Sequence, residues 1–242
     1  MKRSNDMPPL HAIDHWQERS DEDTIKPKST FFFIVEGSNT EIWYLDQLFM
    51  NLSEEKFHDV FKLVLINREG DKDKTASHPS KLLEYGNWLI KNGIEDRYTY
   101  EKDLDEIVFV FDCDIYRGNE SSYIEIMSSL EEIGMIGVTF PSFELFLLLH
   151  KKNAFHKYIE TNKTELYENK KINKHKREIN RLFSESYGFN PKKNEKETRK
   201  LAQYFNLAVK NERFLNQDKT KCLTCLTSNI GQTISKIVNN DL

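Results

Sequence analysis

The sequence predicts an α/β fold: a parallel β-sheet flanked by helices, followed by a C-terminal helical extension. Two kinds of segment predict it. Phe31–Val35 and Glu106–Phe111 are almost continuously apolar, which is typical of strands buried on both faces of a parallel sheet. Segments with apolar residues at helical spacing separate these strands, as expected for strand–helix–strand units.

The predicted elements alternate over residues 30–150. The expected strands cover residues 31–35, 61–66, 106–111 and 135–139, and the expected helices cover approximately residues 40–51, 80–91, 121–133 and 143–150. Residues 1–29 are polar, contain three prolines and lack periodicity, so we expect an irregular N-terminal arm. Over residues 151–242 strand signals are absent and Lys-rich amphipathic segments prevail, so we expect a basic helical extension.

Charge is divided unevenly along the 242 residues, whose formal net charge is −4. Residues 1–150 contain 15 Lys and Arg against 29 Asp and Glu, whereas residues 151–220 contain 18 against 9. An acidic half suits cation binding and a basic half suits contact with a polyanion; the alternative is that the basic residues form solvated helix faces. If nucleic acid binds, the expected contacts are a cluster with Tyr167 and Phe183 interleaved: Lys171, Lys174, Lys176, Arg177 and Arg181.

The cysteine count and the hydropathy of the sequence indicate the cellular compartment of the protein. Three cysteines do not suggest a disulfide scaffold, and no apolar run is long enough to span a bilayer. We therefore expect a cytoplasmic protein without membrane contact. Cys222-x-x-Cys225 lacks a second pair of ligands, so a zinc site is not expected.

Acidic side chains follow two of the predicted strands. Glu36 comes directly after the first strand, and Asp112 and Asp114 follow the third. Ligands of parallel α/β sheets bind beyond the carboxyl ends of the strands, and an extended backbone would direct Asp112 and Asp114 to one face. Close carboxylates are costly without a cation, and hard oxygen ligands favour Mg²⁺ or Mn²⁺ over Zn²⁺. The alternative is an ordinary strand end and an Asp-rich turn.

Three motifs in this order resemble a known family. Val35-Glu36-Gly37, then Thr40-Glu41, then Asp112-x-Asp114 resemble the Toprim domain of topoisomerases, primases and OLD-type nucleases. Residues 141–150, PSFELFLLLH, resemble the NPxFExWLLLH signature of RloB-like proteins, which are compact Toprim proteins found beside restriction–modification and abortive-infection loci. Thr139-Phe140 precedes Pro141 where that family has Asn-Pro, and Phe146 replaces its common Trp.

The resemblance implies roles for five carboxylates. Glu36 would be a general base or acid and a metal ligand, and Asp112 and Asp114 would be the metal-binding pair. Glu41 would match a second acidic position of two-metal nucleases, and Glu144 would reach the metal from the third motif. Both Glu41 and Glu144 could instead be carboxylates placed at helix N-termini by the helix dipole.

The implied activity is a Mg²⁺- or Mn²⁺-dependent Toprim phosphodiesterase. The protein would be a nuclease acting on RNA, with tRNA one candidate, or on DNA, as the toxic effector of an antiphage system with a partner AAA-type ATPase. The alternative is a non-catalytic regulatory subunit of such a complex. The chain contains no Walker A motif, so it does not supply the ATPase itself. A third interpretation is a receiver-like or phosphatase α/β domain, in which an acidic cluster binds Mg²⁺ and an Asp is phosphorylated. Glu36-Gly37 argues against it, because such domains usually place Asp residues there.

Overall fold

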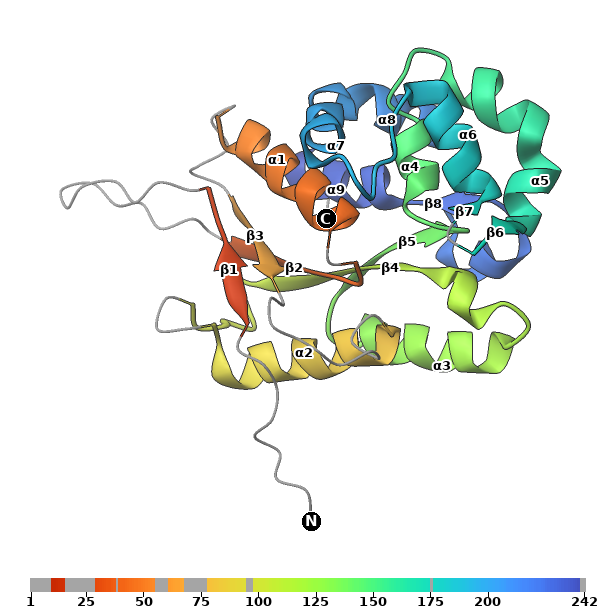
Figure 1. Cartoon of the computed structure of the whole chain (residues 1–242). Helices are drawn as coiled ribbons and strands as arrows, with labels where there is room; N and C mark the ends of the chain where they lie inside the picture. The colour runs from red at the N-terminus through yellow and green to blue at the C-terminus, as the bar shows by residue number, and fades with distance from the viewer. Residues whose placement is uncertain are drawn as a thin grey trace.

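A six-stranded sheet separates two layers of helices (Figure 1). The computed structural model describes residues 10–15, 29–37, 39–54, 61–67, 78–94, 98–174 and 176–239. The strands lie in the order β1-β3-β2-β4-β5-β8. Their bounds are His11–Ile13 (β1), Ser29–Val35 (β2), Phe61–Asn67 (β3), Glu106–Asp112 (β4), Met135–Phe140 (β5) and Thr227–Ser228 (β8).

The centre of the sheet is parallel and its two edges are antiparallel. β2 pairs in parallel with β3 and β4, and β4 pairs in parallel with β5. β1 and β8 run antiparallel along β3 and β5. The predicted α/β class is therefore confirmed, and the mostly parallel sheet is consistent with a Toprim-like arrangement.

Helices and turns connect the strands as predicted and continue beyond them. The α-helices are Thr40–Glu54 (α1), Pro79–Asn92 (α2), Glu120–Glu131 (α3), Glu144–Leu148 (α4), Lys163–Glu168 (α5), Glu178–Tyr187 (α6), Glu195–Leu201 (α7), Phe205–Glu212 (α8) and Ile230–Asn239 (α9). Shorter elements are the 3₁₀ helices Cys113–Tyr116 (η1), Glu160–Asn162 (η3), Ala202–Tyr204 (η4) and Lys219–Thr224 (η5), the π-helix Phe155–Ile159 (η2), and the hairpin Lys171–Asn173 (β6) with Lys176–Arg177 (β7). Within the described ranges, no helix is both long and apolar enough to cross a membrane.

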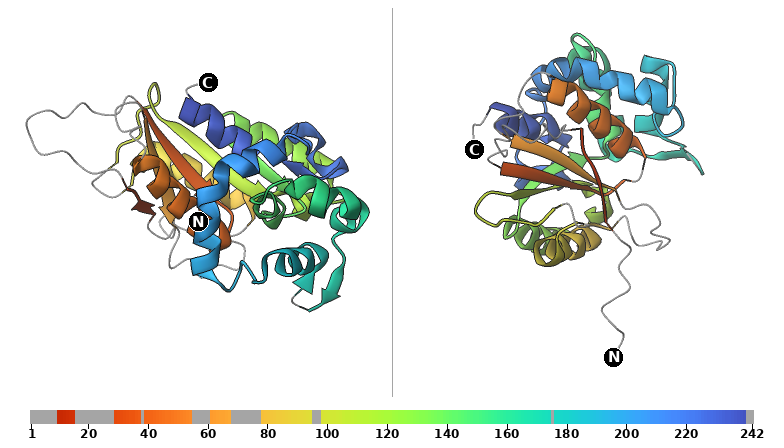
Figure 2. Two further views of the ribbon diagram at one scale, coloured as in Figure 1. Left: turned by 90° about the horizontal axis from the view of Figure 1, so that it is seen from above. Right: turned by 90° about the vertical axis from the view of Figure 1, so that its left-hand side faces the viewer.

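Alternation along each strand divides the core between the two layers. In β4, Val108 and Val110 belong to the cluster beneath α1, whereas Phe109 and Phe111 belong to the cluster beneath α2 and α3. Side chains of a strand point to opposite faces in turn, so a continuously apolar run supplies both clusters. Figure 2 shows the two helix layers from two further directions.

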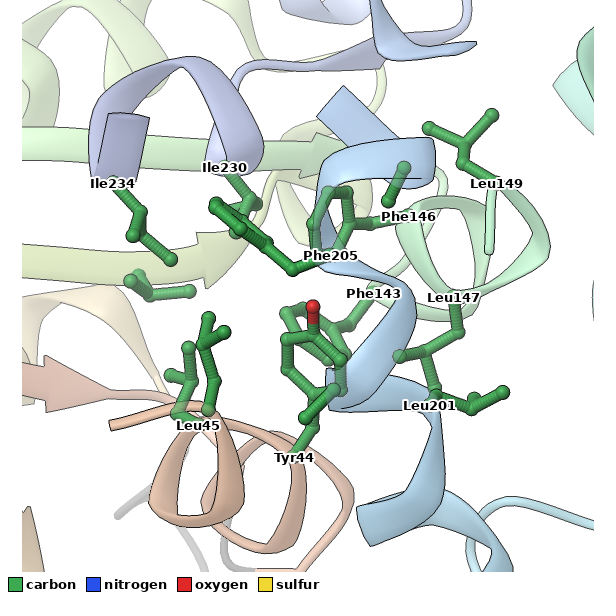
Figure 3. Packing of buried hydrophobic residues seen from close by; sticks show 14 of the residues in the cluster. Tyr44, Leu45, Phe143, Phe146, Leu147, Leu149, Leu201, Phe205, Ile230 and Ile234 are labelled. Atoms are coloured by element: carbon green, nitrogen blue, oxygen red, sulfur yellow. The ribbon is translucent and has the colours of Figure 1, made fainter. Parts of the chain in front are cut away.

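The helices after residue 150 share the core of the α1 layer. Tyr44 and Leu45 of α1 contact side chains that come from α4, α7, α8 and α9, among them Phe146, Phe205 and Ile234 (Figure 3). The boundary at residue 150 stays a prediction from composition, but side chains from both sides of it pack into one hydrophobic cluster.

Two expectations about the ends of the chain are wrong in part. His11–Ile13, inside the expected irregular arm, forms β1 on the edge of β3. A three-residue strand is too short to show periodicity, and it forms because β3 presents unpaired backbone groups along that edge. The rest of the arm, residues 1–9 and 16–28, lies outside the described residues.

The extension also contains strands that its composition did not reveal. β8 pairs with β5, and the side chain of Asn229 continues this pairing. Its Oδ1 accepts from the Val138 N–H at 2.7 Å, and its Nδ2 donates to the Ile136 carbonyl at 3.1 Å. These side-chain bonds add to a backbone bond, in which the Asn229 N–H donates to the Val138 carbonyl at 3.3 Å.

A buried carboxylate anchors the last helix. Glu212 accepts hydrogen bonds from the Ser228 hydroxyl at 2.6 Å and from the N–H groups of Gly231 and Gln232 at 3.0 and 2.8 Å. These N–H groups belong to the first turn of α9, where the helix has no internal acceptors for them. Glu212 therefore fixes α9 to α8 and to β8.

His150, the last residue of the third sequence motif, is part of the core. Its Nδ1 lies 3.1 Å from the Leu147 carbonyl, which can only accept, so Nδ1 carries the proton and Nε2 accepts from the Tyr44 hydroxyl at 2.7 Å. Burial lowers the pKa of His150 to about 4. The residue is a neutral core histidine, which gives it a structural role.

The depressed pKa of His150 predicts a stability loss in acid. The unfolded chain binds a proton at the ordinary pKa of 6.5, whereas the native chain does so only near pH 4. The stabilisation is complete above pH 6.5 and is lost as the pH falls toward 4, in total about 3 kcal/mol. Denaturant melts at pH 7 and pH 4.5 should show a larger loss for the wild type than for His150→Gln. Equal losses in the two proteins would contradict the assignment.

Candidate active site

The first carboxylate is placed by the pairing of β2 with β4. Val35 lies opposite Val110, so Glu36 leaves β2 beside the last residues of β4. The Glu36 N–H donates to the Val110 carbonyl at 2.9 Å, and its Oε2 accepts from the Asp112 N–H, also at 2.9 Å. Glu36 and Asp112 therefore meet at the carboxyl edge of the sheet, as the sequence predicts.

Asp112 is held from its other side by β5. Thr139, its partner in the parallel register, donates its hydroxyl proton to Asp112 Oδ1. Burial raises the pKa of Asp112 well above its usual value, and the neighbouring carboxylates of Glu36 and Glu41 raise it further. The Thr139 hydrogen bond opposes this rise. Asp112 thus lies at the centre of a cluster of acidic groups that raise its pKa.

Glu41 folds back from α1 over the turn at Gly37. A Cβ atom on Gly37 would lie 1.9 Å from Glu41 Oε2. The missing side chain of Gly37 therefore makes room for the Glu41 carboxylate near the strand ends. A larger residue at position 37 would displace the Glu41 carboxylate from this place.

Glu144 enters the site from the first turn of α4 and is only 2% exposed. Its carboxylate accepts from the Ser142 hydroxyl at 2.5 Å and from Asn180 Nδ2 at 3.1 Å, and Lys192 Nζ lies 3.0 Å away. Glu144 raises the pKa of Lys192, with Glu41 and Asp112 adding to the effect. The Lys192 ammonium therefore interacts electrostatically with three carboxylates of the site.

Asp114 is placed differently from the sequence expectation. The chain is not extended beyond Asp112 but turns into the 3₁₀ helix η1, so strand alternation does not relate the two aspartates. Asp114 faces Arg177, whose NH1 lies 3.4 Å from its Oδ2. Burial raises the pKa of Asp114, whereas Arg177, Arg117 and Lys192 oppose that rise. Asp114 lies on the side of the site where the cations gather.

Comparison with known proteins bears on this arrangement. A family model described as RloB-like protein matches residues 31–240, which span every carboxylate of the site. The chain belongs to the RloB-like family. No curated protein and no solved structure matched it. The family assignment agrees with the resemblance seen in residues 141–150, and it describes kinship without naming an activity.

The carboxylates of this RloB-like protein are of the chemical type that binds a divalent cation, but among the described residues the structure does not group them closely enough to hold one. Carboxylate oxygens are the ligands that Mg²⁺ and Mn²⁺ prefer. In the part of the chain that the structure describes, however, no three Asp, Glu, His or Cys side chains are grouped closely enough to hold a metal ion. Glu36 is engaged with the Asp112 N–H and Glu144 with Lys192, so metal binding would require these side chains to change partners.

The predicted nucleic-acid residues of the RloB-like protein differ in their exposure and in their ion-pair partners. Lys171 and Lys174 are exposed on the β6–β7 hairpin, and Lys176 follows in β7. Arg177 contacts Asp114 and so joins the hairpin to the acidic site. Arg181 is paired with two carboxylates of its own helix, Glu178 at 2.8 Å and Glu185 at 2.6 Å, which compensate its charge.

Several residues of the site have no clear signal in the sequence. Arg117 donates to the carbonyls of Tyr167 and Glu168 and lies over the ring of Phe140, 4.9 Å from its centroid. Arg117 thereby joins the extension, at Tyr167 and Glu168, to the ends of β4 and β5. Lys192 follows Pro191 in a Lys-rich run, but its contact with Glu144, 48 positions away, is decided by tertiary packing.

Loss of Lys192 should destabilise the protein, because Glu144 would keep a buried negative charge without its cation. We expect Lys192→Gln to lower the free energy of unfolding by about 1–2 kcal/mol, less than for a fully buried pair because Lys192 is 59% exposed. Denaturant melts measure this. Lys193→Gln, at the exposed neighbouring position, is the matched control, and equal stability of the two variants would contradict the pairing.

Proposed function

We propose that this RloB-like protein is a Mg²⁺- or Mn²⁺-dependent phosphodiesterase that cleaves nucleic acid. The convergence of Glu36, Glu41, Asp112 and Glu144 supports it, since these residues come from distant parts of the chain and influence one another at the carboxyl edge of a parallel sheet. Ligand sites of open α/β sheets form at this edge. Close carboxylates of this kind are costly to maintain unless a cation joins them.

The residues divide the work as follows. Asp112, Glu36, Glu41 and Glu144 would hold the cation once Glu36 and Glu144 exchange their present partners, and the bound cation would supply Lewis-acid stabilisation of the phosphoryl group. Thr139 orients Asp112 through its hydroxyl. Glu36, whose Oε2 now accepts from a backbone N–H, would take a proton from the attacking water. Lys192 and Arg177 lie beside Glu144 and Asp114, and their positive charges would attract the phosphate oxygens of the substrate.

Cellular context is part of the proposal. The nuclease would be the toxic effector of an antiphage system, acting on RNA, including tRNA, or on DNA, and an AAA-type ATPase would be its partner. The RloB-like family assignment supports this context, together with the resemblance carried by residues 141–150.

A second candidate function is a non-catalytic subunit of the same kind of complex. The observation that favours it is the ion pair of Glu144 with Lys192, because the ammonium already supplies positive charge to the carboxylate cluster. In that case the site would stabilise the fold, and the protein would act through its partner.

A cleavage assay separates the two. Purified protein is incubated with tRNA, single-stranded RNA, single-stranded DNA and duplex DNA in Mg²⁺ or Mn²⁺, and the products are resolved on gels. Asp112→Asn keeps an acceptor for Thr139 and should reduce cleavage more than about a hundredfold, since even supporting residues around metals contribute 10–100-fold. Glu125→Gln, an exposed carboxylate on α3, should retain full cleavage. Undiminished cleavage by Asp112→Asn would refute the proposal.

The cellular role is tested by expressing the protein with its neighbouring ATPase gene, with and without Asp112→Asn, followed by sequencing of RNA and DNA ends. Toxicity and defined new ends that disappear with the substitution are the expected result. Toxicity that persists in Asp112→Asn, with no new ends, would favour the non-catalytic role.

A further inference from the structure

An open polar cleft lies between α1 and α7, which pack side by side on one face of the sheet (Figure 1). Its volume is about 620 Å³. The lining contains three cations, three amides and one carboxylate: Lys196, Arg199, Lys200, Gln47, Asn51, Gln203 and Glu195. Arg199 is paired with Glu195 and Asp46, so the positive charge open to an anionic, hydrogen-bonding ligand is that of Lys196 and Lys200.

The two lysines of the cleft are available to a ligand. Lys196 and Lys200 are exposed and lie one turn apart on the same side of α7, with a rise of about 6 Å between them. Lys200 contacts Glu197 at 2.7 Å, a pair in which both side chains are exposed and which is therefore readily exchanged for another anion. Among the described residues, no carboxylate lies within ion-pair distance of Lys196.

The walls of the cleft are fixed by a separate contact. Arg199 of α7 binds the Asp46 carboxylate of α1, and that carboxylate also lies 2.6 Å from His15 Nε2. On the α1 side, Gln47 Nε2 donates to Asn51 Oδ1 at 2.9 Å. The cleft is thus formed before a ligand enters, and little ordering is required on binding.

One segment of the chain, residues 192–200, connects the candidate active site with the cleft. Lys192, whose ammonium lies 3.0 Å from Glu144, precedes Lys196 by four residues, as Lys196 precedes Lys200. Lys192 lies in the turn before α7, and the same chain segment continues into α7, which supplies Lys196 and Lys200 to the cleft. A nucleic-acid backbone carries charge at regular intervals and takes many of its contacts from lysines and side-chain amides.

We propose that the α1–α7 cleft binds the sugar–phosphate backbone of a single-stranded stretch of the substrate and leads that strand to the carboxylates. This inference rests on the proposed function, because the bound strand is the substrate of the proposed nuclease. Lys196 and Lys200, one helical turn apart, would contact phosphates, and Gln47, Asn51 and Gln203 would contact phosphates or sugars. The contacts carry no base preference, so affinity depends on salt and not on sequence.

Binding is measured without cleavage. Fluorescence anisotropy of a labelled 20-nucleotide single-stranded RNA is recorded with the full chain in EDTA, at several salt concentrations. Lys196→Gln/Lys200→Gln should bind about tenfold more weakly, and the slope of log K against log salt should fall by about 1.4, the value for two lost phosphate contacts. Lys196→Arg/Lys200→Arg should retain binding.

The matched control removes two exposed lysines outside the cleft, Lys91 of α2 and Lys102 in the turn before β4, as Lys91→Gln/Lys102→Gln, and should leave affinity and slope unchanged. Equal affinity and slope in the Lys196/Lys200 variant would overturn the inference, as would an equal loss in the control pair. Binding of a poly-glutamate peptide in preference to RNA would overturn it as well, and would assign the cleft to an acidic protein partner. RNA binding that depends on the two lysines, without cleavage by the wild type, would refute the nuclease but not the cleft.

Discussion

The candidate site depends on the parallel pairing of β2 with β4. This register sets Val35 against Val110, so two strands far apart in the sequence end at the same level of the sheet. Glu36 then has a backbone donor, the Asp112 N–H, at 2.9 Å. The next strand repeats the pattern, because the register of β4 with β5 sets Thr139 against Asp112. A slip of one residue in either register would turn these side chains to the opposite face.

The candidate site also requires the C-terminal extension, which contributes side chains to it. Asn180 and Lys192 contact Glu144, Arg177 contacts Asp114, and Arg117 is held by carbonyls of Tyr167 and Glu168. The extension is positioned by the same hydrophobic cluster that buries Tyr44 and Phe146. The acidic half and the basic half of the chain therefore meet at one place, and their opposite charges are locally paired there.

Electrostatic compensation explains how the carboxylates coexist. Asp112 has a raised pKa because it is buried among Glu36, Glu41 and Glu144, while Asp114 and Glu144 have cations of the extension beside them. In this arrangement the ammonium group of Lys192 and the guanidinium group of Arg177 offset part of the negative charge of the cluster.

The sequence by itself determined the α/β class, the four central strands and the order of the acidic motifs. These follow from local patterns: continuous apolar runs for buried parallel strands, and carboxylates placed directly after them. Only the tertiary structure decided that β1 and β8 close the edges, that Asp114 turns away into η1, and that Lys192 faces Glu144. Short edge strands have no periodicity to detect, and an ion pair between residues 144 and 192 depends on how α4 and the segment before α7 pack. Sequence periodicity shows which face of its own helix or strand a residue occupies. A site made from many elements depends instead on how those elements pack against one another.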